Sequence, residues 1–290
     1  MDASWGIDFI YATIRAATPL IYCALGVLLA ERAGVMHLGV EGVMLTGALA
    51  GIIATNMSGT IFMGILMTLL TGLLLGLLLS IASIWLPTDQ VIVGIAFNLA
   101  ATGVTSYIYR LLGSTAQNMV AGIKPVFLGM TIFEIFSVIL TVAIWWFLFK
   151  TAAGLKLRSV GEDANAANTA GIDVIKVRTI TLIVAAILSA LGGAALSLGW
   201  VRVFTDNITG GRGFIALAAV YLSKWNPLLV IVSTLIFGAG EALAFRSQAL
   251  GGAINSYYYF MLPYVLTLIV VGITGKTRGP ADVGRVFIRR

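Results

Sequence analysis

Long stretches without a charged side chain dominate the chain. No Asp, Glu, Lys or Arg occurs in residues 42–88, 90–109, 179–201 or 247–275. Each stretch reaches the length of about 20 residues that an α-helix needs to cross the hydrocarbon core of a bilayer. The apolar runs are continuous, whereas the strands of an outer-membrane barrel alternate over about ten residues. The pattern therefore predicts an all-α, polytopic membrane protein.

Nine hydrophobic segments are expected along the chain. They cover roughly residues 6–30, 38–56, 61–85, 91–111, 131–149, 179–201, 213–224, 227–245 and 256–275. Two of them are unusual, because 38–56 is rich in glycine and 213–224 is too short to cross about 30 Å of hydrocarbon. Such segments are typical of helices broken around a cavity. Since these two follow spans of opposite direction, we expect two broken or short helices in an inverted-repeat arrangement.

Composition and charge narrow the class of protein. Hydrophobic residues make up 59% of the chain and charged residues only 10%, against about 25% charged residues in a soluble domain. This excludes a soluble enzyme, a nucleic-acid-binding module and a disordered chain. With the N-terminus outside and nine crossings, 12 of the 18 Lys and Arg fall inside, which predicts a cytoplasmic C-terminus. One membrane domain, residues 1–290, is expected, and its longest polar stretch is 150–178.

No catalytic or metal-binding pattern is visible. The sequence has no P-loop, GxSxG or CxxC motif, and Cys23 and His37 are the single residues of their types. An ion-coupled transporter needs several ionisable groups within the membrane, and the candidates are Glu41, Glu134 and Glu241. We expect Glu134 to lie near a segment end and to face the lipid headgroups, and Glu241 to have a polar role at a helix end.

Two polar residues in apolar segments, Glu41 and Asn98, are candidates for hydrogen bonds that hold the fold together. Glu41 lies among Gly39, Gly42 and Gly47, where an unpaired charge would be costly. We expect it to accept hydrogen bonds from backbone N–H groups or from a polar side chain, and so to hold the break in the helix. For Asn98 two roles stay open, an interhelical hydrogen bond and a contact with substrate.

The polar stretch contains a short predicted helix. Residues 160–170 are small, polar and rich in alanine. We expect Gly161 to precede the helix, and Glu162 and Asp163 to lie near its start, where the helix dipole favours anions. Gly171 can end it.

Three blocks of sequence resemble one transporter family. They are ERAGVMHLGVEGVMLTGALAG (Glu31–Gly51), RSVGEDANAANTAGIDVIKVR (Arg158–Arg178) and GRGFIALAAVYLSKWNP (Gly211–Pro227). Together they are similar to permease subunits of ABC importers for branched-chain amino acids, ribose-type sugars and nucleosides. The resemblance spans nearly the whole chain and is most specific to the nucleoside branch. His37 departs from it, because relatives often carry Asn there.

The resemblance implies a multi-pass permease of the cell membrane, surrounded by lipid and binding no nucleic acid. It would act with a second, homologous permease chain, two ATP-binding domains and an extracytoplasmic substrate-binding lipoprotein. ATP hydrolysis is then expected on a separate subunit, so this chain would be no enzyme and would need no cofactor or metal. The residues expected to couple it to the ATPase are Gly161, Glu162, Asp163, Ala166, Ala167 and Gly171.

The expected substrate is a small neutral solute, a nucleoside in the first place. Its flat base and hydroxylated sugar call for a path with few charges, some polar groups and aromatic faces. The residues expected to form this path, or to support the broken helices, are His37, Glu41, Phe97, Asn98, Thr102, Gly211, Gly213 and Phe214. The alternatives are ribose-type sugars or branched-chain amino acids, an ion-coupled secondary transporter, and a purely structural membrane subunit.

Overall fold

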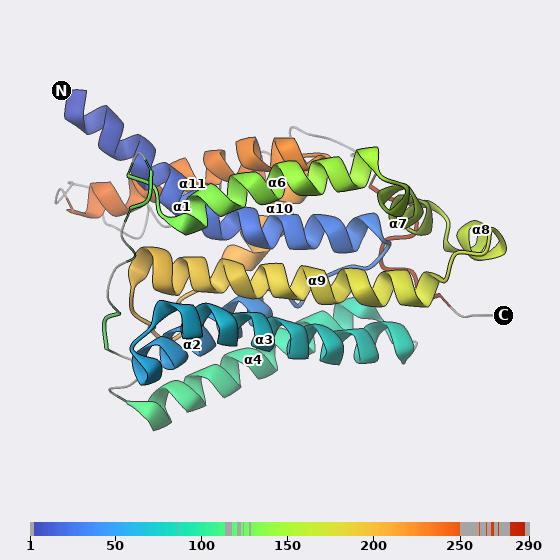
Figure 1. Ribbon diagram of the computed structural model, residues 1–290, viewed down its shortest axis with the longest axis horizontal. Helices are drawn as coiled ribbons and strands as arrows, with labels where there is room; N and C mark the ends of the chain where they lie inside the picture. The colour runs from blue at the N-terminus through green and yellow to red at the C-terminus, as the bar shows by residue number, and fades with distance from the viewer. Residues whose placement is uncertain are drawn as a thin grey trace.

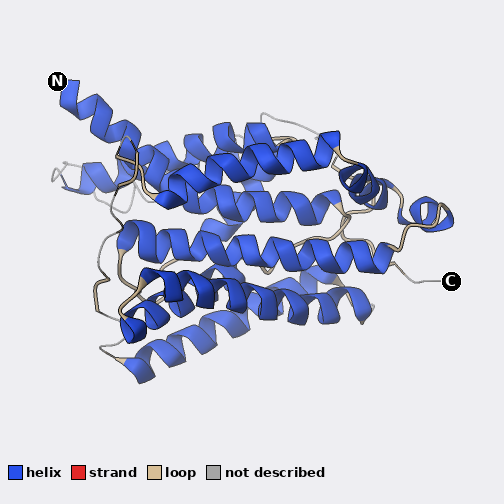
Figure 2. Cartoon of the chain, in the orientation of Figure 1, coloured by secondary structure: helices blue, strands red, loops and turns tan. Residues whose placement is uncertain are grey.

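A computed structural model describes most of the chain. It covers residues 3–86, 88–113, 118–120, 125–127, 129–249 and 279–287, with isolated positions at 123, 261, 265, 268, 269 and 272. The helices are α1 (Ala3–Arg32), α2 (Val40–Ser58), α3 (Ile61–Ser80), η1 (Ile81–Trp85), α4 (Gln90–Leu112), α6 (Ile132–Lys150), α7 (Ala152–Glu162), α8 (Ala164–Thr169), α9 (Val174–Ala194), η2 (Ala195–Val201), α10 (Arg212–Leu222) and α11 (Pro227–Ala249), where η1 and η2 are π-helical continuations of α3 and α9. Within these residues a single bridge, Phe127 to Met130, is the only β-type pairing, so the all-α prediction is confirmed (Figure 2).

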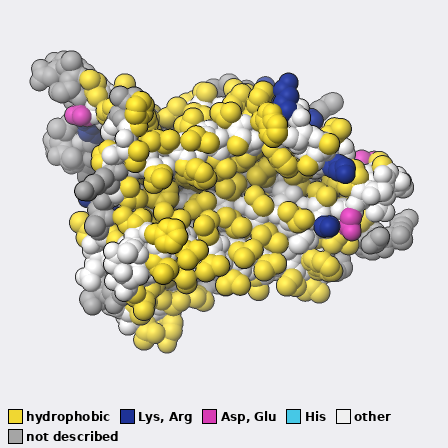
Figure 3. All heavy atoms as spheres, in the orientation of Figure 1, with side chains coloured by type: hydrophobic (Ala, Val, Ile, Leu, Met, Phe, Trp, Pro, Cys, Tyr) yellow, Lys and Arg dark blue, Asp and Glu magenta, His cyan; other side chains and the backbone are white. Residues whose placement is uncertain are grey.

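Seven of the helices are long and apolar enough to span a membrane. They are Gly6–Arg32, Val40–Ser58, Ile61–Trp85, Gln90–Leu112, Ile132–Lys150, Val174–Val201 and Pro227–Arg246. Each corresponds to a predicted segment, and α10 is the short eighth segment. The ninth, residues 256–275, lies mostly outside the described residues. Figure 3 shows hydrophobic side chains across the middle of the visible face and charged side chains at its two ends, as expected for a bundle that crosses a bilayer.

Local signals in the sequence set several helix ends. Asp89 precedes α4 and accepts hydrogen bonds from the N–H groups of Val91 and Ile92, which would otherwise have no partner in the helix. Gly59 follows α2 with a φ of 71°, a left-handed conformation in which glycine ends a helix at little cost.

Helices α1 and α9 lie in the middle of the bundle. Helix α1 contacts α6, α9, α10 and α11, whereas α2 and α3 cover the other side of α9 (Figure 1). Glycines permit these close crossings. A Cβ atom on Gly47 would lie 2.7 Å from the Cα of Ala190, and one on Gly72 would lie 2.7 Å from the Cα of Ile187. Such small-residue crossings are typical of helices that pack inside a bilayer.

Helices α2 and α10, with their entry loops 33–39 and 202–211, form what we call the inverted pair. Helix α10 begins next to α2, because Gly211 and Gly213 bond to Glu41. It ends beside the C-terminal end of α1, where Arg32 donates to the carbonyl of Trp225. Helix α2 instead leads away from that end of the bundle (Figure 1). The opposed arrangement predicted from the sequence is therefore confirmed.

One detail of that prediction needs correction. Helix α2 is continuous from Val40 to Ser58, so the glycine-rich segment is not broken within itself. The interruption is loop 33–39, which precedes α2. The glycines of α2 instead permit neighbouring helices to pack closely against it.

Candidate functional site

The centre of the inverted pair is the carboxylate of Glu41, in the first turn of α2. Its Oε1 accepts a hydrogen bond from the N–H of Gly211 at 2.8 Å, and its Oε2 accepts one from the N–H of Gly213 at 2.6 Å. These N–H groups belong to the start of α10, where backbone donors lack helical partners and the dipole favours negative charge. The expectation that Glu41 accepts backbone hydrogen bonds is confirmed. We call this contact the Glu41 clamp.

Glycine is required on both sides of the clamp. Gly211 has a φ of 85°, in the left-handed region that glycine occupies without strain. A Cβ atom on Gly213 would lie 2.7 Å from the Cα of Glu41, closer than real side-chain contacts allow. The predicted residues Gly211 and Gly213 therefore permit α10 to approach the backbone of α2.

Asn98 of α4 holds the other side of the α2 entrance. Its Nδ2 donates to the carbonyl of Leu38 at 2.8 Å, and its Oδ1 accepts from the N–H of Gly42 at 2.8 Å. Both ends of the amide are thus used between helices, which supports the interhelical role over a contact with substrate. Phe97 lies beside this contact, 3.0 Å from where a Cβ on Gly42 would be. Thr102 donates to the carbonyl of Asn98 within α4.

His37 is buried in loop 33–39 and lies 3.2 Å from the Oγ of Ser189 on α9. Because the Ser189 hydroxyl donates to the carbonyl of Ala185, its oxygen is left to accept from the His37 Nε2–H group. His37 therefore fastens the loop to α9. Phe214 differs from the other predicted residues, because it lies 46% exposed on the outer side of α10.

An ion pair that the sequence analysis did not foresee lies next to the clamp. Arg212, between the two clamp glycines, donates to Glu241 of α11 and lies 5.8 Å above the ring of Trp200. The sequence held one indication of this ion pair, namely a positive and a negative residue in two different apolar segments. The two residues are 29 positions apart and lie on different helices, so the sequence gave no reason to pair them. Glu241 therefore forms an ion pair with Arg212, which the expected polar role at a helix end did not include.

Glu134 lies near a segment end as expected, in the first turn of α6, but its side chain does not face the lipid headgroups. Glu134 is buried and accepts hydrogen bonds from the backbone and the hydroxyl of Thr131, at the start of α6. The two form a capping box, whose Thr-x-x-Glu signature is readable in the sequence. All three carboxylates that were candidates for ion coupling therefore have hydrogen-bond partners.

The predicted polar helix is in fact two helices, α7 and α8, at the end of the bundle where α1 ends (Figure 1). Gly161 and Glu162 close α7 rather than precede a helix, and a Cβ on Gly161 would lie 2.2 Å from the carbonyl oxygen of Arg32. Asp163 caps α8 by accepting from the N–H of Ala166 at 2.9 Å. Gly171, with a φ of 82°, ends α8 as predicted.

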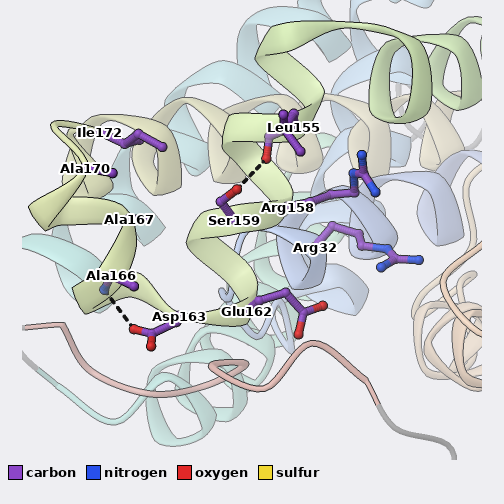
Figure 4. Close-up of a pocket in the computed structure, with 10 residues that line it drawn as sticks. All are labelled: Arg32, Leu155, Arg158, Ser159, Glu162, Asp163, Ala166, Ala167, Ala170 and Ile172. Atoms are coloured by element: carbon purple, nitrogen blue, oxygen red, sulfur yellow. Dashed lines mark hydrogen bonds between the residues drawn. The ribbon is translucent and has the colours of Figure 1, made fainter.

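A cavity of about 490 Å³ lies between α7, α8 and the end of α1. Figure 4 shows its lining, which is Arg32, Leu155, Arg158, Ser159, Glu162, Asp163, Ala166, Ala167, Ala170 and Ile172. The two predicted alanines differ in environment. Ala166 is exposed, whereas Ala167 is buried in a small cluster with Val160 and Val174. Only Ala166 is therefore available to a partner.

Comparison with known proteins agrees with the resemblance found in the sequence. The chain matches the family described as branched-chain amino acid transport system, permease component, over residues 9–271. It is 33% identical to the guanosine ABC transporter permease protein NupQ of Bacillus subtilis, covering 96% of this chain and 95% of that protein. It is 30% identical to the nucleoside ABC transporter permease protein NupC of Lactococcus lactis, covering 94% of each. The ribose import permease protein RbsC of Bacillus subtilis is 29% identical over 52% of this chain and 47% of that protein.

Proposed function

Because the chain belongs to the permease family of branched-chain amino acid transport systems, we propose that it carries nucleosides across the cell membrane. It is the permease subunit of an ABC importer. The relatives NupQ and NupC, which align over nearly the full chain, are named for guanosine and nucleosides. This full-length similarity supports the nucleoside as substrate.

The hydrogen bonding of the three intramembrane carboxylates favours an ATP-driven permease over an ion-coupled transporter. Glu41 is held by two backbone N–H groups, Glu134 caps α6 and Glu241 pairs with Arg212. A coupling carboxylate has to exchange a proton or cation with the transport path, and these three are committed to the fold. Transport energy must then come from the ATP-binding partners.

The path is proposed to run along the inverted pair, between this chain and a second, homologous permease. Phe214 is exposed at the start of α10 and offers an aromatic face for a nucleoside base. His37, Glu41, Asn98, Gly211 and Gly213 support the geometry of this region rather than contact the solute. Phe97 and Thr102, half-buried on α4, complete the proposed set.

The coupling site is proposed at α7–α8, which projects from the end of the bundle. Exposed Ala166, with Glu162 and Asp163 beside it, would enter a cleft on one of the two ATP-binding domains. That end of the bundle would then be cytoplasmic, and an extracytoplasmic substrate-binding lipoprotein would deliver the solute to the opposite end. No catalytic group, cofactor or metal of this chain is needed in this scheme.

Uptake measurements test the substrate directly. A strain lacking this gene should lose uptake of radiolabelled nucleoside, and expression of the chain should restore it. Ribose and leucine, measured in the same strain, are the competing substrates. Loss and recovery of ribose or leucine uptake, with nucleoside uptake unchanged, would overturn the proposed substrate within the same family.

A further inference from the structure

The last described segment, residues 279–287, crosses the α7–α8 end of the bundle, and we call it the C-terminal strap. Asp282 joins it to both helices there. The N–H of Asp282 donates to the carbonyl of Gly161 at 2.9 Å, and its Oδ2 accepts from the N–H of Ala164 at 2.7 Å. Asp282 is buried, so one residue bridges the end of α7 and the start of α8.

The strap also binds the entry loop of α2. The N–H of Gly284 donates to the carbonyl of Gly34 at 3.2 Å. Arg178, at the start of α9, donates to the carbonyl of Arg285 at 2.8 Å and to the carbonyl of Ala33 at 3.2 Å. Arg178 is only 2% exposed and its bond to Ala33 is buried, so these bonds hold strap, loop and α9 together.

At its other end the strap reaches the turn that follows α10. A Cβ atom on Gly279 would lie 2.6 Å from the ring of Trp225, so the strap backbone packs directly on this side chain. The indole of Trp225 donates to Glu31 at 2.5 Å, and Arg32 donates to its carbonyl at 2.8 Å. The strap thus contacts the end of α10 where it is fastened to α1.

We propose that the C-terminal strap transmits movement of α7–α8 to both members of the inverted pair, with Asp282 as the positioning residue that fixes α8 to it. This inference rests on the proposed coupling function of α7–α8. The strap touches the loop that leads into α2 and the turn that ends α10, and these two helices meet at the Glu41 clamp. A displacement of α8 therefore reaches the α2 side of the clamp through the hydrogen bonds of Asp282 and Gly284. It reaches the α10 side through the close packing of Gly279 on Trp225.

Two variants remove the same hydrogen bond from opposite partners. Asp282→Ala deletes the acceptor. Ala164→Pro deletes the donor at the first position of α8, where proline suits the helix, and the extended backbone of Asp163 is compatible with a following proline. Arg285→Ala is the matched control, because its side chain is 73% exposed and, among the described residues, pairs with Asp282 alone, whereas its backbone carbonyl is kept.

The measurement is nucleoside uptake per ATP hydrolysed by the assembled importer in proteoliposomes, with ATPase co-purification and melting temperature recorded for each variant. We expect both variants to keep the bound ATPase. Asp282→Ala should lower the melting temperature somewhat, because it leaves the buried N–H of Ala164 unpaired, whereas Ala164→Pro removes that N–H and should keep the melting temperature of the wild type. Uptake per ATP should fall about tenfold, a typical allosteric coupling factor. Asp282→Asn keeps one side-chain oxygen as acceptor and should recover part of the loss, and Arg285→Ala should match the wild type.

Two results would overturn the proposal. Either both variants show the uptake per ATP of the wild type, or Ala164→Pro loses uptake only together with its melting temperature or its bound ATPase, which would make the strap a structural support only. Failure of the proposed substrate is distinguishable, because a wild-type importer that carries ribose instead still permits the same ratio to be measured with ribose.

Discussion

At the scale of single residues, the polar groups inside the bundle hold the fold around the inverted pair. Glu41 and Asn98 each use both of their polar atoms on backbone groups at the entrance of α2. A buried backbone group without a partner costs about 1–3 kcal/mol, so each of these side chains replaces a bond that a helix end lacks. The sequence showed that these two polar residues lie in apolar segments. It did not show their hydrogen-bond partners, which are up to 172 residues away.

The loss of uptake caused by substituting Glu41 should depend on how many hydrogen-bond acceptors the new side chain offers to Gly211 and Gly213. Glu41→Leu leaves the N–H groups of Gly211 and Gly213 unpaired, at about 1–3 kcal/mol for each buried donor, and should abolish uptake or folding. Glu41→Gln keeps one acceptor and turns an NH₂ group toward a donor, so an intermediate loss is expected. Uptake normalised to the amount of protein in the membrane, together with the melting temperature, measures both.

The clamp can also be tested from α10. Gly213→Ala forces a Cβ toward the backbone of Glu41 and should reproduce the loss, whereas Gly103→Ala on α4, with nothing within 4 Å, should be neutral. A Glu41→Leu protein with wild-type uptake would contradict the clamp. A Glu41→Gln protein with a normal membrane level and no uptake would show that the charge itself is required, and would favour the ion-coupled alternative.

At the scale of elements, α7–α8 shows how a correct composition signal led to wrong helix boundaries. The small residues and the closing Gly171 were recognised, but Gly161 was placed before the helix. Glycine is a weak helix former in isolation, and only the close contact with Arg32 explains its place in the last turn of α7. Asp163, not Gly161, is the point where the chain changes direction.

The different environments of the two alanines give a prediction for the coupling segment. Ala166→Trp should leave the melting temperature unchanged and abolish ATPase co-purification, because the exposed side chain would overfill a tight contact. Ala167→Trp should lower the melting temperature, since Ala167 is packed against Val160 and Val174. The control is Ala100→Trp on the exposed side of α4. Full ATPase binding by Ala166→Trp would place the coupling site elsewhere.

At the scale of the whole molecule, the bundle has two distinct ends. The N-terminus lies at one end, and α7, α8 and the C-terminal strap lie together at the other (Figure 1). The apolar side chains between them cover the visible face (Figure 3). The count of basic residues in the sequence predicts that the α7–α8 end is cytoplasmic.

Reporter fusions test this orientation. A reporter active only in the cytoplasm should be active at the C-terminus and inactive at the N-terminus, because the strap shares the end at which α7–α8 would meet an ATPase. Immunoblots of both fusions control for equal expression. Activity at the N-terminal fusion alone would reverse the orientation and move the proposed coupling site outside the cell.

The sequence by itself determined the class of the protein, the seven spans found among the described residues and the short α10, because apolar length and glycine content are local properties that a bilayer constrains strongly. It also marked Glu41, Gly211 and Gly213 as unusual. Only the tertiary structure decided that these three meet, that Arg212 pairs with Glu241, and that Asp282 joins α7 to α8. Each of these contacts joins segments far apart in the chain, and hydrophobic patterning carries no information about which distant polar groups become neighbours when the helices pack.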